Sequence, residues 1–458
     1  MSQKVQEFIQ LGTKALQENN LRDAQYNFSQ AVMLNPSDTK ALFCLGIVCQ
    51  KDNNITDAQA LFLEVLKINP KYVEAYSMLA HIYFNEGEIV AAKECYEYAL
   101  KIDTSNAELY NNLGSSHQEL NELQEAKTSY KKAIELLPGY ISVLYNLSYV
   151  YLKEGNYQEG FNLYRYRYTK EIRGESLGGV AYPPTLLTPE INIQDKVIYI
   201  SHEQGLGDTI QFIRYLPFFT KKAKKVLCYV PESLQKLFAL NYPDVEFINP
   251  NSTITFDYNF PMLEAPYLLG TLYDTVPFKN QYLKIQDKDL ANVQKYFKKK
   301  SSRLKVGINY KGSQGEKAAK GRSLELKVLL KSLTPFLDSY DFYSLQYEYT
   351  PEEENLLQEY GLTNLGKEIH SFYDTALFIE SMDIVISVDT SLLNLAGAMG
   401  KKTFALLKFC PDWRWGVEAQ TNNWYSSIYG IKQDQIHQWD HVLTTLANKL
   451  QKIKDEIL

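Results

Sequence analysis

The feature that most restricts the fold of this chain is a period of 34 residues that runs through its first third. A small residue recurs at one position of the period, alanine follows twelve residues later, and a large apolar or aromatic residue follows that alanine. The first two copies carry the pattern at Phe8, Leu11, Gly12, Ala24, Phe28, Ala31 and Pro36, and then at Leu42, Leu45, Gly46, Ala58, Phe62, Val65 and Pro70. The pattern continues to Tyr164, so this part of the chain is predicted to be a repeat array.

The spacing resembles the tetratricopeptide repeat, in which each copy is a pair of antiparallel helices. Small residues at the eighth and twentieth positions let the two helices approach closely, large residues at the fourth and twenty-fourth fill the gaps, and proline ends the second helix. Each pair buries its apolar face only against its neighbours. Residues 1–168 are therefore expected to form an all-α solenoid of about five repeats.

Arrays of this kind present a concave face that captures an extended peptide or a partner domain. Asn112 and Asn146 occupy the same position of the last two copies. Stacked amides there would resemble those of the nucleocytoplasmic O-linked N-acetylglucosamine transferases, and would hold a peptide backbone. The alternative is two polar residues on the solenoid surface, since the earlier copies have Gln10, Cys44 and Met78 at this position.

The rest of the chain alternates short β-branched or aromatic runs with helical patterns, in two series that begin with KVIYI and LKVGINY. This alternation is typical of parallel βα units. We expect a linker at 169–194, a Rossmann-like acceptor half at 195–300, a Rossmann-like nucleotide-sugar half at 301–433 and a closing helix at 434–458. A cleft would face the carboxyl ends of both sets of strands. The predicted fold class is thus α plus α/β.

Composition excludes several classes of protein. The chain has 48 Lys and Arg against 54 Asp and Glu, a formal charge of −6, and lacks the basic field that nucleic-acid binding requires. Five scattered cysteines form no C-x-x-C pair, which suits a reducing compartment. His437 and His441 have no acidic partners in sequence, so no metal site is expected. Without a long apolar run or a leader, the protein is expected to be cytoplasmic, with no transmembrane segment.

The turn SHEQGLGDTI follows the first strand of the first half, where open α/β sheets bind ligands. Gly205 and Gly207 would let the backbone turn sharply and approach a ligand. Asp208 would begin the next helix, either as a cap or as a catalytic base. His202 and Glu203 are rival bases, and a pKa near neutral favours the histidine.

The second half has a corresponding turn. A buried strand ends at Val388, and Asp389-Thr390-Ser391 leads directly into a helix. The first free backbone N–H groups of that helix, from Ser391 and Leu392 onward, would bind a diphosphate. Asp389 would accept hydrogen bonds from sugar hydroxyls, or would only cap the helix.

A glycine-containing basic loop follows the strand at 304–310 and carries Lys311, Lys317, Lys320 and Arg322. Facing a helix N-terminus, such a loop would neutralise phosphate charge. The alternative is an ordinary solvated loop.

Four segments in order carry a more specific resemblance: EQGLGDTIQFIRYLP, FYSLQ, DTALFIESMDIVISVDTSLLNLAGAMGK and PDWRWG. Together they resemble bacterial proteins that join tetratricopeptide repeats to a glycosyltransferase domain related to the lipopolysaccharide heptosyltransferases. The resemblance implies a GT-B fold, with the nucleotide-sugar bound mainly to the second half and the acceptor to the first. It makes Asp208 the catalytic base and Asp389 the residue that contacts the sugar.

The donor-binding residues expected from the loop, the turn and the resemblance are Lys311, Arg322, Gln346, Asp389, Thr390, Ser391, Leu392 and Asn394. The family motif has glycine where this chain has Ser391 and histidine where it has Asn394, so a heptose donor is not implied. Trp413, Arg414 and Trp415 would border the nucleotide or pack in the interior.

The function that follows is transfer of a sugar from a nucleotide-sugar to an acceptor hydroxyl, with inversion and without a metal or other cofactor. The array would present a protein acceptor. The alternative is a protein-interaction scaffold whose transferase domain no longer turns over.

Overall fold

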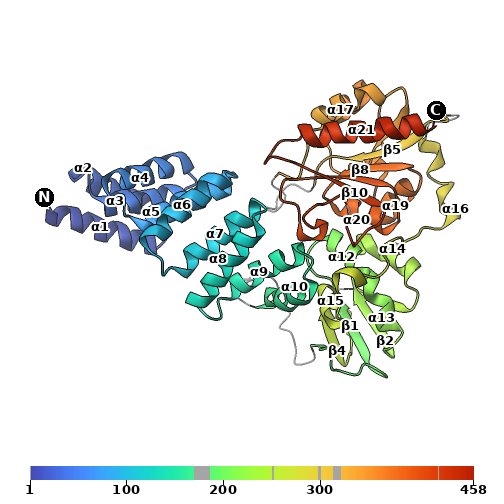
Figure 1. The fold of residues 1–458 in the computed structure, drawn as a ribbon, viewed down its shortest axis with the longest axis horizontal. Coiled ribbons are helices and arrows are strands. Elements are labelled where there is room, and N and C mark those ends of the chain that lie inside the picture. The colour runs from blue at the N-terminus through green and yellow to red at the C-terminus, as the bar shows by residue number, and fades with distance from the viewer. Residues whose placement is uncertain are drawn as a thin grey trace. The chain divides into compact units, whose positions relative to one another are not determined.

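The computed structural model describes residues 2–169, 186–249, 252–297, 301–312, 321–420 and 422–457. The chain forms two compact units, Met1–Val150 and Tyr151–Leu458. Each is described by itself below (Figure 1).

The first unit is all helical, and consecutive helices pack in pairs (Figure 1). Its helices are α1 (Ser2–Gln17), α2 (Leu21–Leu34), α3 (Thr39–Lys51), α4 (Ile55–Ile68), α5 (Val73–Glu86), α6 (Ile89–Ile102), α7 (Ala107–Glu119), α8 (Leu123–Leu136) and most of α9 (Ile141–Lys153). Side-chain caps from asparagine or aspartate begin several of them, for example Asn20 before α2 and Asp38 before α3.

The repeat pattern is explained by one packing contact within each pair. A Cβ added to Gly12 would lie 2.8 Å from the ring of Phe28, and one added to Gly46 would lie 2.6 Å from the ring of Phe62. Both rings are fully buried. The eighth position must therefore be small because the aromatic residue at the twenty-fourth lies directly against it.

The second unit contains two sheets in which every strand pairing is parallel. The first sheet has the order β3-β2-β1-β4, and the second has the order β10-β9-β8-β5-β6-β7. The strands are β1 (Val197–Ser201), β2 (Lys225–Tyr229), β3 (Val245–Ile248), β4 (Tyr258–Pro261), β5 (Leu304–Asn309), β6 (Tyr340–Ser344), β7 (Thr363–Asn364), β8 (Ile384–Val388), β9 (Thr403–Leu407) and β10 (Ile428–Lys432). The predicted fold class, a helical array followed by two Rossmann-like domains, is confirmed.

Helices cover both sheets. The main ones are α12 (Leu206–Phe212), α13 (Leu216–Thr220), α14 (Glu232–Asn241), α15 (Ala265–Leu268), α16 (Asp287–Leu290), α17 (Leu326–Leu333), α18 (Pro351–Glu359), α19 (Phe372–Glu380), α20 (Ser391–Ala398) and α21 (Asp440–Ile457). The core of the second sheet joins its strands to apolar residues of α17 and α21, while α20 lies toward α12 (Figure 1).

The strand orders place a switch point in each sheet. In the first sheet, β2 and β3 extend from one side of β1, and β4 is added later on its other side. In the second sheet, β6 and β7 extend from one side of β5, and β8 is added later on its other side. Ligands of open α/β sheets bind at the carboxyl ends of the strands at such points. The loops that follow β1, β4, β5 and β8 are therefore the ones that position a site.

The second unit also contains the last helices of the repeat region, α10 (Tyr157–Tyr164) and the 3-10 helix η1 (Arg165–Tyr168). Residues 170–185 of the expected linker lie outside the described residues. Its end packs on the first sheet, because Leu186 pairs with Asn259 of β4 and Leu187 is buried.

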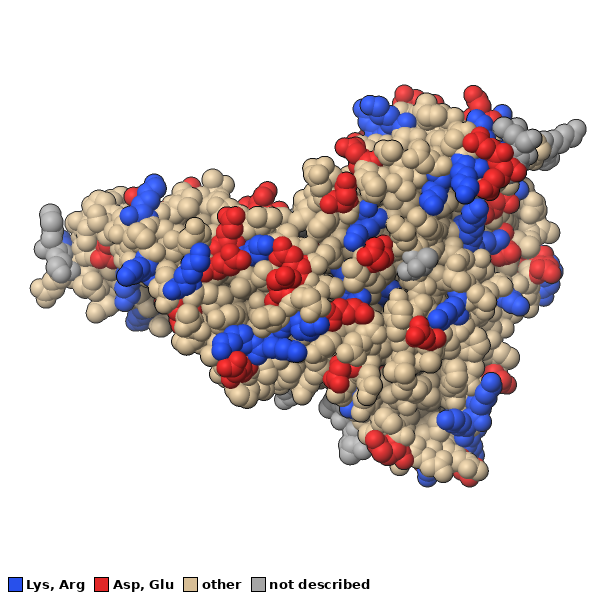
Figure 2. Space-filling model, in the orientation of Figure 1, with Lys and Arg blue, Asp and Glu red and all other residues tan. Residues whose placement is uncertain are grey.

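Charged side chains are interspersed on the face drawn in Figure 2. Lysine and arginine alternate with aspartate and glutamate there, over both the helical unit and the α/β unit. No helix in the described ranges is long and apolar enough to cross a membrane.

Candidate functional site

The two predicted turns lie together in the structure. A Cβ added to Gly207 of α12 would lie 2.9 Å from Nδ2 of Asn394 and 3.4 Å from Cα of Ser391, both in α20. A side chain at 207 would separate the two helices, so the glycine serves a close helix contact. The loop after β1 and the loop after β8 are thereby brought to one place.

The sharp bend before α12 is made by another residue. Gln204 has the left-handed φ of +60°, whereas Gly205 is the N-cap of α12 with an extended backbone, φ −85° and ψ 169°. The left-handed region is uncommon for residues other than glycine. The structure therefore assigns the turn to Gln204 and the close approach to Gly207.

Among the described residues, Asp208 has one partner on each carboxylate oxygen. Its Oδ2 accepts the backbone N–H of Gly205 at 2.9 Å, which closes the first turn of α12, and its Oδ1 forms an ion pair with Nη2 of Arg414. The side chain is 21% exposed. Because a carboxylate has about four acceptor positions, each oxygen keeps a lone pair for a further hydroxyl.

The two rival bases have other partners. Nδ1 of His202 lies 2.6 Å from Oγ1 of Thr209, and burial lowers the pKa of this histidine, although the nearby Asp208 works against the shift. Glu203 is held in an ion pair with Arg167, with Oε1 2.8 Å from Nε, and its side chain is 8% exposed.

Asp389 lies after β8, among charged neighbours. Burial first, and then the carboxylate of Asp412, raise the pKa of Asp389 to about 6, against the lowering effect of Arg322, Trp415 and Arg414. Arg414 also forms an ion pair with Asp412, with Nη1 2.7 Å from Oδ1. Arg414 thus connects Asp208 of the first half to Asp412 of the second, and it also lowers the pKa of Asp389.

No side chain in the described ranges caps the N-terminus of α20. Thr390 is its N-cap residue, but the Thr390 hydroxyl donates to Oδ1 of Asn309 at 2.9 Å instead of accepting from the helix. The first-turn N–H groups of Ser391 and Leu392 are therefore not satisfied by the cap residue. Such an end is favourable for an anion.

Three residues that lower the pKa of Asp389 each carry a buried N–H donor with no hydrogen-bond partner in the part of the chain that the structure describes. These donors are Nε of Arg322, Nε of Arg414 and Nε1 of Trp415. The Trp415 indole lies against Asp389, close enough to favour its charged form but outside hydrogen-bond geometry. A buried donor without an acceptor costs about 1 to 3 kcal/mol, so this region is suited to a bound acceptor group.

Gln346 and Lys311 organise the loop after β5. Oε1 of Gln346 accepts Nδ2 of Asn309 at 2.8 Å and the backbone N–H of Lys311 at 3.1 Å. Nζ of Lys311 lies 2.6 Å from Oε2 of Glu353, so its charge already has a partner. Beside it is a cavity of about 380 Å³ lined by Lys311, Ser323, Leu324, Glu353 and Leu356 among others. Lys317 and Lys320 lie outside the described residues.

Asn394 is fixed at both ends of its amide. Nδ2 donates to the carbonyl of Thr390 at 3.2 Å, and Oδ1 accepts the hydroxyl of Tyr425 at 3.0 Å. The residue is 9% exposed. Its position beside Gly207 is therefore well defined.

In the first unit, the two predicted asparagines are joined through a third. Asn146 Nδ2 donates to Oδ1 of Asn111 at 3.0 Å, and Asn111 Nδ2 donates to Oδ1 of Asn112 at 3.1 Å. The row of amides is thus Asn112, Asn111 and Asn146. Asn111 falls outside the repeated sixth position, so the period gave no reason to select it.

Sequence reasoning also missed the roles of Asp412, Asn309, Arg167 and Glu264. Asp412 lies in the segment PDWRWG, whose charged pair beside the tryptophans was the available signal. Asn309 ends β5 at the switch point, and polar residues at strand ends are a usable signal as well. Among the described residues, no group of three or more histidine, cysteine or acidic side chains is placed to hold a metal ion.

Comparisons with known proteins agree with the repeat assignment. Tetratricopeptide repeat models match residues 61–94 and 107–140, and a TPR repeat model matches residues 80–121. Protein FlbA of Caulobacter vibrioides is 25% identical over 291 residues, which are 57% of this chain and 47% of FlbA. The chain spans about half the length of this curated relative.

Two similar solved structures each cover 36% of this chain. A structure of MamA from residue 41 to its end, from Desulfovibrio magneticus RS-1, is 16% identical with a TM-score of 0.33, over 36% of this chain and 90% of that one. PilF of Pseudomonas aeruginosa is 21% identical with a TM-score of 0.34, over 36% of this chain and 75% of that one. By its family-model matches and its two all-parallel sheets, the chain is a tetratricopeptide-repeat array followed by two parallel α/β domains, with distant homology to Caulobacter FlbA.

Proposed function

We propose that the α/β unit is a glycosyltransferase of GT-B type that moves a sugar from a nucleotide-sugar to a hydroxyl of a protein bound by the repeat array. The observation that carries the proposal is the close approach of α12 to the start of α20, where a Cβ added to Gly207, the residue before Asp208, would lie 3.4 Å from Cα of Ser391. Asp208 thus lies on a helix that packs against α20 and is paired with Arg414, whose Nε has no acceptor among the described residues. Base catalysis and stabilisation of an anionic leaving group require these two elements side by side.

The proposed reaction assigns a role to each group. The acceptor oxygen forms a bond to the anomeric carbon while the bond from that carbon to the diphosphate oxygen breaks. The acceptor proton goes to Asp208, and the electron pair leaves with the nucleoside diphosphate. The amides of α20 and the side chains of Arg322 and Arg414 stabilise that diphosphate, and the anomeric carbon is inverted.

The nucleoside would occupy the cavity beside Lys311. Its volume of about 380 Å³ lies within the usual range for small-molecule sites. In this assignment Gln346 and Asn309 act indirectly, because they hold the loop after β5. Asp389, with its raised pKa, would donate or accept a hydrogen bond at a sugar hydroxyl.

The repeat array supplies the reason for a protein acceptor. Tetratricopeptide arrays bind protein partners, and the side-chain amides of Asn112, Asn111 and Asn146 form one hydrogen-bonded row, which in this proposal would pair with a peptide backbone. A protein that both binds an extended chain and transfers a sugar is expected to modify that chain.

Nucleotide binding is the first test. Uridine, guanosine, adenosine and cytidine nucleotides and their common sugar conjugates are added to the full chain, and thermal unfolding is followed. A ligand at about 100 times its Kd stabilises its domain by about 2.7 kcal/mol, which raises Tm by a few degrees. We expect one nucleotide class to act, and Arg322→Ala to weaken it at least tenfold. Lys331→Ala, an exposed change on α17, is the matched control.

A sugar-transfer assay distinguishes an enzyme from a scaffold that only binds the nucleotide. With the nucleotide that binds, Asp208→Asn should abolish sugar transfer while the Kd for that nucleotide changes little. Binding without transfer in the wild type, given the partner proteins that the array captures, would favour the scaffold instead. No shift with any nucleotide of the panel would remove the basis for the proposal.

A further inference from the structure

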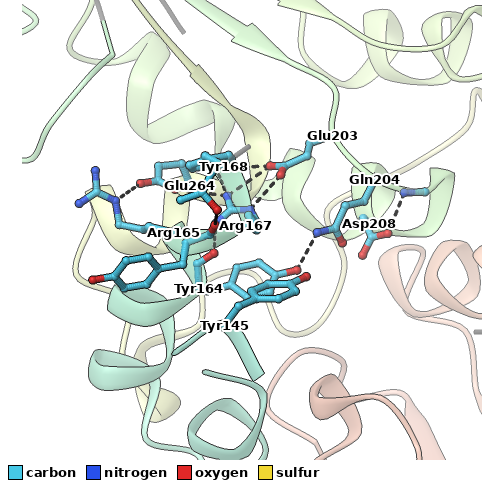
Figure 3. Close-up of polar contacts among 12 residues, drawn as sticks. Tyr145, Tyr164, Arg165, Arg167, Tyr168, Glu203, Gln204, Asp208 and Glu264 are labelled. Atoms are coloured by element: carbon cyan, nitrogen blue, oxygen red, sulfur yellow. Dashed lines mark hydrogen bonds and ion pairs between the residues drawn. The ribbon is translucent and has the colours of Figure 1, made fainter. Parts of the chain in front are cut away.

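A buried ion-pair cluster lies at the end of the first sheet, next to the proposed site. Nε of Arg167 donates to Oε1 of Glu203 at 2.8 Å, and its Nη2 is 3.2 Å from Oε2 of Glu264. Nε of Arg165 donates to the other oxygen of Glu264 at 2.5 Å. Glu264 is fully buried, and the Arg167 side chain is 4% exposed. Figure 3 shows the two arginines of η1, with Arg167 reaching both glutamates and Arg165 reaching Glu264.

The cluster fills the switch point of the first sheet. Glu203 follows β1, and Glu264 ends the 3-10 helix that follows β4. The crevice between these two strand ends is where an open α/β sheet binds its ligand. Here Arg167, a residue of the repeat region, occupies it and connects the two loops.

A second contact joins the same loop to the last repeat helix. Nε2 of Gln204 donates to the hydroxyl of Tyr164 at 2.7 Å (Figure 3). Tyr164 is buried at the aromatic position of the fifth repeat. Gln204 is also the residue with the left-handed backbone. Such a conformation costs about 1 to 3 kcal/mol and persists only where the surroundings hold it.

These contacts lead directly to Asp208. Glu203 and Gln204 are held by the last repeat, and the next residue, Gly205, donates its N–H to Oδ2 of Asp208. A change of backbone at 203 or 204 therefore moves the donor that orients the carboxylate. The connection from the repeat to Asp208 is short, because Gln204 and Gly205 are consecutive residues.

Stability alone does not account for a cluster of this kind. A buried ion pair contributes little net stability compared with apolar residues of the same volume, and it is favourable only where its partners are held in a specific geometry. Arg167 is also bound by the carbonyl of Tyr164 at 2.9 Å and stacks on the Tyr168 ring at 3.9 Å. These contacts of Arg167 are thus with the last repeat and with the loops after β1 and β4.

We propose that Arg167 and Tyr164 are positioning residues for the Asp208 loop, so that the last repeat is a structural part of the catalytic centre rather than of the partner-binding array alone. The inference rests on the proposed function for its catalytic meaning. Its structural content, control of the loop 202–208 by the last repeat, is tested without any substrate.

The chain offers a matched pair of variants for each contact. Tyr164→Phe removes the oxygen that holds Gln204, whereas Tyr157→Phe on the same helix removes the oxygen that accepts Trp424 Nε1 at 2.8 Å. Arg167→Lys removes the fork that joins Glu203 to Glu264, whereas Arg165→Lys affects the Glu264 side only. Lysine cannot reproduce the bidentate geometry of arginine.

Amide hydrogen exchange on the full chain tests whether the last repeat controls the loop 202–208. We expect the Gly205 amide to exchange about tenfold faster or more in Tyr164→Phe and Arg167→Lys, and near the wild-type rate in Tyr157→Phe and Arg165→Lys. If Arg167→Lys does not fold, Tyr164→Phe still gives the answer, because it removes a single oxygen. Equal exchange of 202–208 in all four variants and the wild type would overturn the proposal.

Kinetics test the catalytic content. Release of nucleotide from the sugar conjugates of the panel should show kcat reduced about tenfold in Tyr164→Phe, with KM for the conjugate within about twofold, because a base displaced by a fraction of an ångström loses rate and not donor binding. An unchanged kcat with faster loop exchange would disprove the positioning role. If no conjugate turns over, the proposed function fails while hydrogen exchange still decides the control of the loop.

Discussion

At the scale of single residues, Gly207 shows how closely the two halves of the site are fitted. An alanine there would place its Cβ 2.9 Å from the amide of Asn394, which Tyr425 and Thr390 hold in place. Overpacking of this kind costs typically 1 to 3 kcal/mol. We expect Gly207→Ala to lower the free energy of unfolding by about that amount in urea titrations.

A double-mutant cycle tests whether the contact with Asn394 causes this loss of stability. Asn394→Ala removes the obstructing amide, so Gly207→Ala should be nearly neutral in that background. Gly312→Ala is the control, because its Cβ would make only an ordinary contact of 3.7 Å with Thr390. A cost that persists without Asn394 would contradict the assigned contact.

Asp389 gives the second residue-scale prediction, a dependence of stability on pH. Its pKa is about 6 in the folded chain and 3.8 as the reference value, so between these values the folded state binds more protons than the unfolded state. Stability contributed by protonated Asp389 is therefore complete below about pH 3.8 and is lost as the pH rises through 6. The loss amounts to about 3 kcal/mol at pH 8.

Asp389→Asn removes this titration. We expect the variant to be more stable than the wild type in urea at pH 8, and the advantage to shrink by about half at pH 5. Comparing the two proteins at each pH cancels the other titrating groups. A variant less stable than the wild type at pH 8 would mean that the charged carboxylate is a net stabilising partner.

At the scale of elements, α20 is a helix whose end is left open. Thr390→Asp would place a carboxylate where it caps the first-turn amides, and its charge would repel an anionic ligand. We expect nucleotide-dependent stabilisation to disappear in this variant. Thr390→Asn, which caps without charge, should retain part of it, and Thr390→Ser should retain most. Equal losses in Asp and Asn variants would indicate competition for the amides alone.

Most helices and strands were predictable from the sequence, because local packing determines them. The repeat helices follow from small and large residues that pack within one pair, as Gly46 and Phe62 do. The strands follow from apolar runs buried on both faces. The role of η1 was not predictable, because its residues RYRY break the period and their partners, Glu203 and Glu264, lie 36 and 97 residues away from Arg167.

At the scale of the whole α/β unit, a buried arginine that follows α12 contacts the segment before β10. Arg214 is fully buried, with Nη1 2.7 Å from the carbonyl of Trp424 and Nη2 3.0 Å from the hydroxyl of Tyr282. Its Cζ lies 4.8 Å from the ring centre of Tyr425. Carbonyl dipoles and aromatic faces thus replace water around the charge.

Arg214→Lys should destabilise the α/β unit by about 3 kcal/mol or more, since an ammonium cannot reach all of these groups at once. Urea unfolding followed by tryptophan fluorescence measures the change, and Arg303→Lys, on the surface, is the control. A loss below about 1 kcal/mol would show that the contacts of the guanidinium are replaceable.

What the sequence by itself determined is what local physics fixes: a period that packs glycine against an aromatic ring, apolar runs that become strands, and turns whose residues start helices. It therefore determined the array, the two parallel sheets and the candidate residues Asp208 and Asp389. The tertiary structure decided which of those residues meet. Arg414 pairs with Asp208 across 206 positions of sequence, and Arg167 enters the end of the first sheet from the repeat region. Partners so far apart are chosen by the packing of whole elements, and no local pattern in the chain encodes that choice.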